Sequence, residues 1–219
     1  MIFVNYKTYE EGTGKRAVDL TKILEEVAHE TQVKIIPVVQ AGDVKEIVNS
    51  TKLEVWVQKI DAVEFGAHTG SIIPEAVFED GALGTFLNHS ELRFENFEDL
   101  AKASDRAKSV GLKTLIFVND IQELKNITSL SPNYLAYEPP ELVGSSTVSV
   151  STAKPEVIKE AAEIAKLAGI PLIVGAGIHS AEDIRKSLEL GAVGFAVASS
   201  ILLSEDPRRE ILALTEGFK

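Results

Sequence analysis

Short apolar runs alternate with longer amphipathic stretches along the whole chain, and this alternation limits the possible folds more than any other feature. Runs rich in valine, isoleucine and leucine are typical of strands buried on both faces, which helices connect into a parallel sheet with right-handed crossovers. The runs predict strands at 2–6, 33–39, 53–58, 83–87, 113–118, 134–138, 171–174 and 193–197. The stretches between them predict helices at 13–30, 44–50, from 74, at 96–110, 121–127, from 151 or 152 to 168, at 180–190 and at 207–217.

Eight strand and helix units predict an α/β fold, a closed (β/α)8 barrel that forms a single domain over residues 1–219. An open doubly wound sheet is the competing architecture. That fold would favour a Gly-x-Gly-x-x-Gly motif after the first strand, but Asn5, Tyr6 and Lys7 stand there. Because 219 residues are fewer than the ~250 typical of such barrels, some helices must be short.

Composition and charge exclude several classes of protein. A formal net charge of −11 argues against general binding of nucleic acid, which is a polyanion. No apolar stretch reaches the ~18 residues of a membrane span, and the chain opens on a strand without the charged start of a signal peptide, so we expect a cytoplasmic protein. The chain has no cysteine, and no His, Asp and Glu residues have metal-ligand spacing, so we expect no metal.

The segment from 134 to 146 combines a strand, a carboxylate and two prolines. Since proline cannot donate to a sheet ladder, Pro139 requires the strand to stop at Glu138. The prolines stiffen the exit, while Gly144 makes the far end permissive, so the segment between them is predicted to move as a lid. A carboxylate beside a hinged lid is typical of a catalytic base.

Other polar or small residues also follow strands. In a (β/α)8 barrel the carboxyl ends of the strands form one mouth, where the chemistry takes place. The residues predicted to meet there are Asn5 and Lys7 after the first strand, His89 after the fourth, Glu138 after the sixth, Gly175 and Gly177 after the seventh, and Ala198 and Ser199 after the eighth. The loops after the last two strands commonly hold a phosphate, so their small residues predict a phosphate site.

Each of these residues has a simpler interpretation when it is taken alone. Lys7 resembles a solvated surface lysine, Glu138 a strand-end carboxylate in an ion pair, and the glycines resemble tight turns. Position favours a functional role for His89. The residues after it suit the first turn of a helix, whose N-terminus would keep the imidazole neutral.

Taken together, these motifs resemble the triosephosphate isomerase family in its compact archaeal form. The resemblance covers essentially the whole chain, and its motifs occur in the order of the family. They are Val4-Asn5-Tyr6-Lys7, Gly66-Ala67-His68-Thr69-Gly70, Asn88-His89-Ser90-Glu91, Tyr137-Glu138-Pro139-Pro140-Glu141-Leu142, Gly175-Ala176-Gly177 and Ala198-Ser199. Their joint occurrence is much more specific than any one of them.

The resemblance implies a TIM barrel that interconverts dihydroxyacetone phosphate and glyceraldehyde 3-phosphate without a cofactor. It implies that Glu138 transfers the proton between neighbouring carbons, that neutral His89 polarises the carbonyl, and that Lys7 stabilises the enediolate with Asn5 orienting it. It implies a substrate site formed by Asn5, Tyr6, Lys7, Val143, Gly144, Gly177, Ala198 and Ser199. The family is itself a standard example of acid and base roles set by the environment of each group, so these roles rest on the resemblance alone.

The loop containing His68 resembles one that inserts into a neighbouring subunit, which implies a homo-oligomer, a dimer at least and a tetramer in archaeal members. Two other functions stay open. Another phosphosugar barrel such as an aldolase would need a Schiff-base lysine at a strand's carboxyl end, but Lys113 begins its strand and so lies at the opposite rim. A non-catalytic barrel that binds phosphorylated metabolites is the alternative from a different class.

Overall fold

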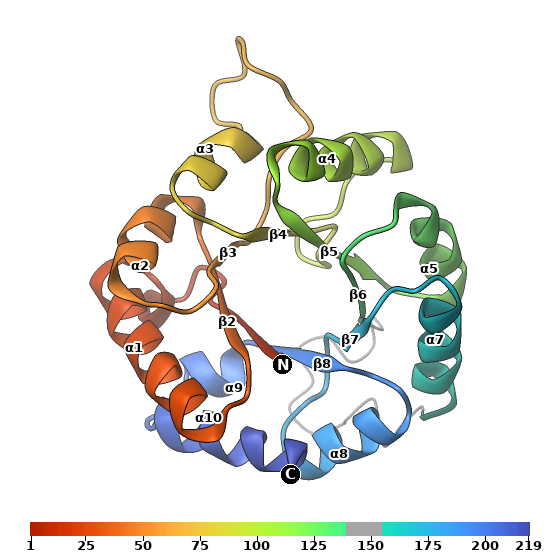
Figure 1. Cartoon of the computed structure of the whole chain (residues 1–219). Helices are drawn as coiled ribbons and strands as arrows, with labels where there is room; N and C mark the ends of the chain where they lie inside the picture. Colours follow the sequence, from red (N-terminus) through yellow and green to blue (C-terminus); the bar gives the residue numbers. More distant parts are fainter. Residues whose placement is uncertain (139–154) are drawn as a thin grey trace.

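Eight parallel strands close into a barrel in chain order, and β8 pairs with β1 to complete it (Figure 1). The structure is a computed structural model that describes residues 1–138 and 155–219. The strands are β1 (Ile2–Asn5), β2 (Ile35–Val39), β3 (Trp56–Val57), β4 (Gly84–Leu87), β5 (Lys113–Val118), β6 (Tyr134–Tyr137), β7 (Leu172–Val174) and β8 (Gly194–Val197). The closed (β/α)8 barrel predicted from the sequence is confirmed, and the open sheet is excluded.

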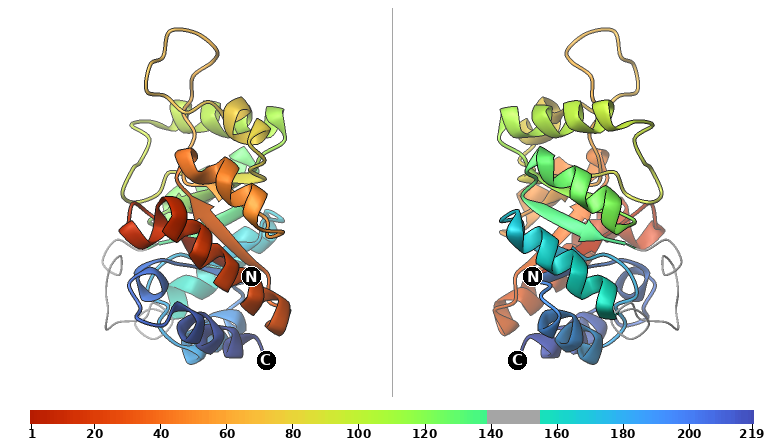
Figure 2. Two further views of the ribbon diagram at one scale, coloured as in Figure 1. Left: turned by 90° about the vertical axis from the view of Figure 1, so that its left-hand side faces the viewer. Right: turned by 90° about the vertical axis from the view of Figure 1, so that its right-hand side faces the viewer.

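Helices surround the barrel as an outer ring, as the view along its axis and the two side views show (Figures 1 and 2). In the described residues they are α1 (Gly14–Thr31), α2 (Val44–Ser50), α3 (Pro74–Glu79), α4 (Phe97–Val110), α5 (Ile121–Ile127), α7 (Pro155–Leu167), α8 (Ala181–Glu189), α9 (Ser199–Leu202) and α10 (Pro207–Thr215). Short 3-10 turns lie at Glu10–Gly12, Ala41–Asp43, Thr128–Leu130 and Glu216–Phe218. Several helices have fewer than ten residues, as the short chain requires.

The helix starts follow local capping chemistry. The side chain of Asn96 accepts a hydrogen bond from the backbone N–H of Asp99 and so begins α4. Asp120 does the same for α5 through the N–H of Glu123. Because a cap satisfies a backbone donor that the helix cannot, each such residue fixes where a strand-to-helix loop ends.

Alternate residues of each strand face two different cores. Phe3, Trp56 and Phe86 point into the barrel, where the rings of Phe3 and Trp56 lie 5.1 Å apart in an edge-to-face arrangement. Ile2 and Val4 point outward and pack under the helices. Side chains therefore fill the barrel interior, which leaves its mouth as the place for a site.

The structure corrects several details of the predicted elements. The third strand makes ladder contacts only at Trp56–Val57 rather than over 53–58. A short helix, α9, begins at Ser199, where we expected a loop. The predicted start of the helix at 151 or 152 lies outside the described residues, and α7 is described from Pro155.

The loop between β3 and α3 extends well away from the barrel (Figures 1 and 2). Asp61 closes its base, because its N–H donates to Ile72 O at 2.8 Å and its carboxylate accepts from Ile72 N at 2.7 Å. Phe65 in this loop is 74% exposed. Among the described helices, none has the length and apolar character needed to cross a membrane.

Candidate active site

A cavity at the carboxyl ends of the strands brings together most of the residues predicted from the sequence. Its lining includes Asn5, Lys7, His89, Glu138, Gly175, Gly177, Ala198 and Ser199. These residues come from the end of β1 and the loop after it, from the loops after β4 and β7, from the end of β6, and from the junction of β8 with α9. Val143, Gly144 and the lid predicted from Pro139 to Ser146 lie outside the described residues.

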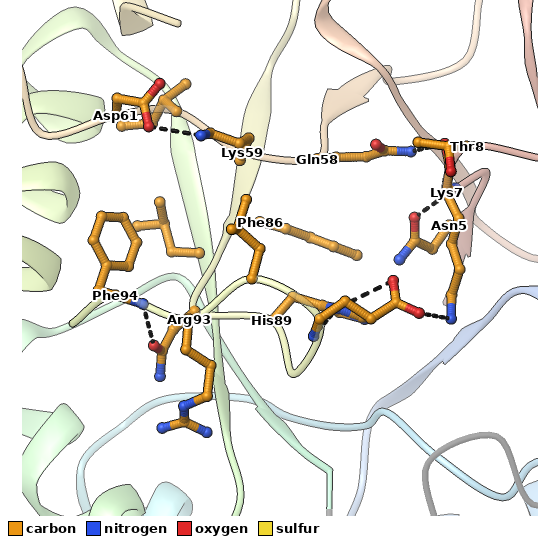
Figure 3. Close-up of a pocket in the computed structure, with 15 residues that line it drawn as sticks. Asn5, Lys7, Thr8, Gln58, Lys59, Asp61, Phe86, His89, Arg93 and Phe94 are labelled. Carbon is orange, nitrogen blue, oxygen red and sulfur yellow. Dashed lines mark hydrogen bonds and ion pairs between the residues drawn. The ribbon is translucent and has the colours of Figure 1, made fainter. Parts of the chain in front are cut away.

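Lys7 has a left-handed backbone conformation, with φ of 48°, which is uncommon for a residue that has a side chain. Two hydrogen bonds hold it. The N–H of Lys7 donates to Asn5 Oδ1 at 3.0 Å, and Gln58 Nε2 donates to Lys7 O at 2.7 Å (Figure 3). Asn5 is 7% exposed. Because both sides of the strained peptide are held, the Lys7 side chain is directed across the mouth of the barrel.

The ammonium of Lys7 pairs with a carboxylate to which the sequence analysis gave no role. Lys7 Nζ lies 2.7 Å from Glu91 Oε1 (Figure 3). Glu91 belongs to the same turn as His89, so this ion pair links the loops after β1 and β4. Gln58, after β3, was also missed. Glu91 follows the predicted strand at 83–87 and Gln58 ends the predicted strand at 53–58, so their positions at strand ends could have identified both.

His89 is a neutral imidazole whose tautomer the structure defines. The backbone N–H of Glu91 donates to His89 Nδ1 at 3.2 Å, so Nδ1 is an acceptor and the ring proton is on Nε2. The ring packs edge-to-face on Phe117 with centroids 4.8 Å apart. Burial lowers the pKa of His89 below its usual value, and Lys7 acts in the same direction, while Glu138 and Glu91 oppose the shift.

The predicted reason for this neutrality was wrong. We expected His89 to lie at the start of a helix, but the residues after it form a turn in which Leu92 N donates to His89 O at 2.9 Å. Helix α4 begins only at Phe97, after its cap Asn96. Burial against the barrel mouth, and not a helix N-terminus, disfavours the charged ring.

Glu138 is buried at the end of β6. It is 3% exposed, and its backbone N–H donates to Val118 O at 2.9 Å, which fixes the residue to the neighbouring strand β5. Among the described residues its Oε2 atom has no hydrogen-bond partner. Its Oε1 atom lies 3.8 Å from His89 Nε2. A buried carboxylate oxygen with no partner, beside a neutral imidazole, has the character of a base.

Small residues also line the cavity. Gly177 has φ of 67°, a conformation that favours glycine. Ala198 precedes α9 and Ser199 is its first residue. Both lie in the cavity lining, where a chain without bulky side chains lets backbone N–H groups approach a ligand.

The side chain of Tyr6 does not belong to the site, contrary to the resemblance. It is fully buried between β1 and the helices, and its hydroxyl lies 2.8 Å from Thr21 Oγ1 on α1. Successive residues of a strand point to opposite sides, so Tyr6 faces outward where Asn5 faces the mouth.

Other candidates lie elsewhere. His68 is exposed in the protruding loop. Lys113 begins β5 at the amino end of the barrel, where its Nζ lies 3.0 Å from Glu54 Oε1, so it is too far from the mouth to form a Schiff base there. Within residues 1–138 and 155–219, no three His, Asp or Glu side chains are grouped to hold a metal ion.

A parallel barrel whose mouth holds a buried carboxylate, a neutral imidazole and an oriented lysine defines a (β/α)8-barrel enzyme that works by acid and base chemistry. Comparison with known proteins gives the family. The profile described as triosephosphate isomerase matches residues 1–216, and the chain belongs to the triosephosphate isomerase family.

Archaeal proteins of this name are similar over nearly their whole length. A triosephosphate isomerase of Metallosphaera sedula is 40% identical over 218 residues, which cover 99% of this chain and 95% of the relative. One from Saccharolobus solfataricus is 41% identical over 214 residues, covering 96% and 92%. One from Methanobacterium bryantii is 39% identical over 216 residues, covering 98% and 95%.

A solved structure shows the same fold. The crystal structure of triosephosphate isomerase from Bartonella henselae superposes with a TM-score of 0.75 at 20% sequence identity, covering 99% of this chain and 98% of the other. The archaeal resemblance and the barrel inferred from the sequence are both confirmed.

Proposed function

We propose that this chain, as a member of the triosephosphate isomerase family, interconverts dihydroxyacetone phosphate and glyceraldehyde 3-phosphate with Glu138 as the base. The carboxylate removes a proton from the carbon next to the carbonyl and returns it to the neighbouring carbon. The observation that carries this role is the buried Oε2 atom of Glu138, which has no hydrogen-bond partner among the described residues and belongs to a residue of the cavity lining.

His89 supplies the hydrogen-bond donor. With Nδ1 occupied by the N–H of Glu91, the proton on Nε2 is on the side of the ring that faces Glu138. Such a donor stabilises negative charge as it develops on the substrate oxygen and passes protons between the two oxygens. The neutral ring gives its Nε2 proton to one substrate oxygen and takes a proton back from the other, so the ring is unchanged at the end of the exchange.

Lys7 supplies the positive charge for the enediolate. Its ammonium lies 2.7 Å from Glu91, and an anionic substrate would compete with Glu91 for it. Asn5 orients the lysine through the bond to its backbone N–H. Backbone groups at Gly177, Ala198 and Ser199 hold the phosphate, together with those of Val143 and Gly144, which lie outside the described residues.

A coupled assay with glyceraldehyde 3-phosphate tests the role of Glu138. Glu138→Asp shortens the side chain by one methylene, and we expect turnover to fall by about 100-fold or more, because a displacement of ~1 Å can cost that much. Glu98→Asp, the same change at an exposed position of α4, is the matched control and should leave turnover unchanged. Equal turnover for the wild type and Glu138→Asp would reject Glu138 as the base.

The assembly is a homo-oligomer in this proposal, with the loop between β3 and α3 inserted into a second copy. Its projection from the barrel and the 74% exposure of Phe65 support this role, since exposed aromatic side chains are enriched at interfaces. Sedimentation should show a dimer or tetramer, and Phe65→Ser should shift it toward the monomer. Leu167→Ser, at another exposed apolar position on α7, should not. A stable wild-type monomer would oppose the interface.

The protein is further proposed to work in the cytoplasm. Charged phosphate esters do not cross membranes unaided, so the enzyme must share a compartment with the enzymes that make its substrate. Fractionation of cells of the source organism should recover the activity with the cytosol, and recovery with the envelope would contradict this.

A further inference from the structure

The hydrogen bonds that His89 makes within its own turn do not attach that turn to the barrel. The donors of these two bonds, Glu91 N and Leu92 N, belong to the same loop, so the bonds hold residues of the loop to one another. A catalytic imidazole must be held at a fixed distance from Glu138, which lies at the end of another strand, β6. The ion pair of Glu91 with Lys7 joins the turn to the loop after β1, so its attachment to the strands next to Glu138 must come from another group.

Asn88, the residue before His89, makes that attachment. It has a left-handed backbone with φ of 61°, which asparagine tolerates better than most residues. It is 4% exposed. Its Nδ2 donates to Phe117 O at 3.0 Å and to Glu123 Oε1 at 3.1 Å, and its Oδ1 accepts from Phe94 N at 3.2 Å. One side chain thus joins β4, β5, α5 and the return of the loop.

Phe117 connects this attachment to the imidazole. The strand residue whose carbonyl accepts from Asn88 is the one whose ring packs on His89 at 4.8 Å. The hydrogen bond from Asn88 Nδ2 to Phe117 O therefore links the residue before His89 to the residue whose ring packs on the imidazole. A shift of Asn88 would move His89 away from Phe117 and change its distance to Glu138.

Glu123 completes the frame from a rigid element. It lies in the first turn of α5, where its backbone N–H donates to Asp120 Oδ1 at 2.8 Å. Its Oε2 accepts from Asn119 N at 2.8 Å, and its Oε1 accepts from both Asn88 and Arg93. Arg93 balances the charge, so the carboxylate serves as a fixed acceptor for the Asn88 amide.

We infer that Asn88 is the positioning residue for His89 and that Glu123 holds the Asn88 amide in place. Neither residue touches the substrate in this account, and both act through the imidazole. The inference rests on the proposed role of His89, and the variants below separate the two claims.

Kinetics of Asn88→Gly test the inference. Glycine keeps the left-handed backbone and removes only the amide. We expect kcat to fall by roughly 10- to 100-fold while KM changes by less than about 3-fold, because a displaced donor affects the reaction more than binding. Asn96→Gly, the same change at the cap of α4 in the same loop, is the control and should leave kcat near the wild type.

Two variants of Glu123 provide a rescue test. Glu123→Ala removes the acceptor and should lower kcat as Asn88→Gly does. Glu123→Gln keeps one oxygen for the Asn88 amide, but its NH2 group faces the N–H of Asn119 and Arg93 loses its counter-charge, so it should restore only part of the activity that Glu123→Ala loses. Because the two residues share one hydrogen bond, the loss in the double variant of Asn88→Gly with Glu123→Ala should be smaller than the sum of the two single losses. Additive losses would overturn the coupling.

NMR of the His89 ring gives a readout independent of turnover. In the wild type the nearby Phe117 ring displaces the imidazole proton signals, and Asn88→Gly should change that displacement while Asn96→Gly does not. If His89→Gln is strongly impaired, then an unchanged His89 signal and an unchanged kcat in Asn88→Gly would overturn the positioning role of Asn88 and leave the proposed role of His89 intact. Full activity of His89→Gln would instead overturn the proposed role of His89, and the positioning role with it.

Discussion

Replacing Tyr6 by phenylalanine separates a packing role from a binding role, because the variant keeps the ring and removes only the hydroxyl. In the structure that hydroxyl lies 2.8 Å from Thr21 Oγ1, and Thr21 Oγ1 in turn donates to Ala17 O at 2.7 Å. The single hydroxyl proton of Thr21 is therefore committed to Ala17, so Tyr6 is the donor of the pair. Burial raises the pKa of Tyr6 above its usual value, and the residue stays a neutral donor.

The magnitude follows from this direction of donation. Tyr6→Phe removes the donor and leaves Thr21 still bonded to Ala17, so we expect the free energy of unfolding to fall by about 1 kcal/mol, the net value of one such bond. Thr21→Val leaves the Tyr6 hydroxyl buried without an acceptor, which costs about 1 to 3 kcal/mol. With both partners apolar, the double variant should be more stable than Thr21→Val alone.

Thermal and urea unfolding at one fixed protein concentration measure these differences, since an oligomer's stability depends on concentration. For a chain of this size, ~1 kcal/mol corresponds to a change in Tm of about 2 to 4 °C. The kinetic constants of Tyr6→Phe should match the wild type. A rise in KM with unchanged stability would refute the packing role and return Tyr6 to the substrate site.

Three further predictions concern the site. Gly175→Ala should lower kcat by roughly 3- to 10-fold with little change in KM, as steady-state kinetics will show. The new Cβ would lie 3.3 Å from Phe117 Cε1, so the ring that packs on His89 must give way by a few tenths of an ångström, and it would touch Glu138 Cβ at 3.4 Å. NMR titration of His89 should give a pKa below about 6.5, so that activity persists as the pH falls past that value. The neutral ring's contribution to the free energy of unfolding is present above about pH 6.5 and is lost as the pH falls through the pKa of the folded protein. A pKa at or above 6.5 would contradict burial as the main cause of the shift. Lys113→Met should retain full isomerase activity in the coupled assay, because Lys113 pairs with Glu54 at the far end of the barrel, and a dead but folded variant would revive the Schiff-base alternative.

The sequence was sufficient for the barrel and for most of its mouth. Apolar runs show where strands buried on both faces lie, and closure then carries Lys7, His89 and Glu138 to one edge although they are far apart in the chain. This convergence could be predicted without knowing any distance between the residues, because the carboxyl ends of all the parallel strands lie at the same rim of the barrel.

The errors have local physical causes. The motif placed Tyr6 in the site, but side chains alternate along β1, and Tyr6 points to the helices. This alternation could have been applied to the sequence alone. The helix predicted at 96–110 is correct, but the residues after His89 were interpreted as a further helical turn, because a single turn has no local signal that separates it from a helix start. The partners of Lys7 and Asn88 depend on which side chains meet across loops, which no local pattern encodes.

Exchange of substrate hydrogen with solvent tests the central claim most directly, because a single carboxylate that carries the proton between carbons must release some of it to water. In D2O the wild-type enzyme should place deuterium on the carbon that receives the proton, as NMR of the recovered triose phosphates will show. Glu138→Gln, which keeps the shape and removes the base, should show neither isomerisation nor exchange above the buffer rate. Deuterium incorporation by Glu138→Gln at the wild-type rate would contradict the account.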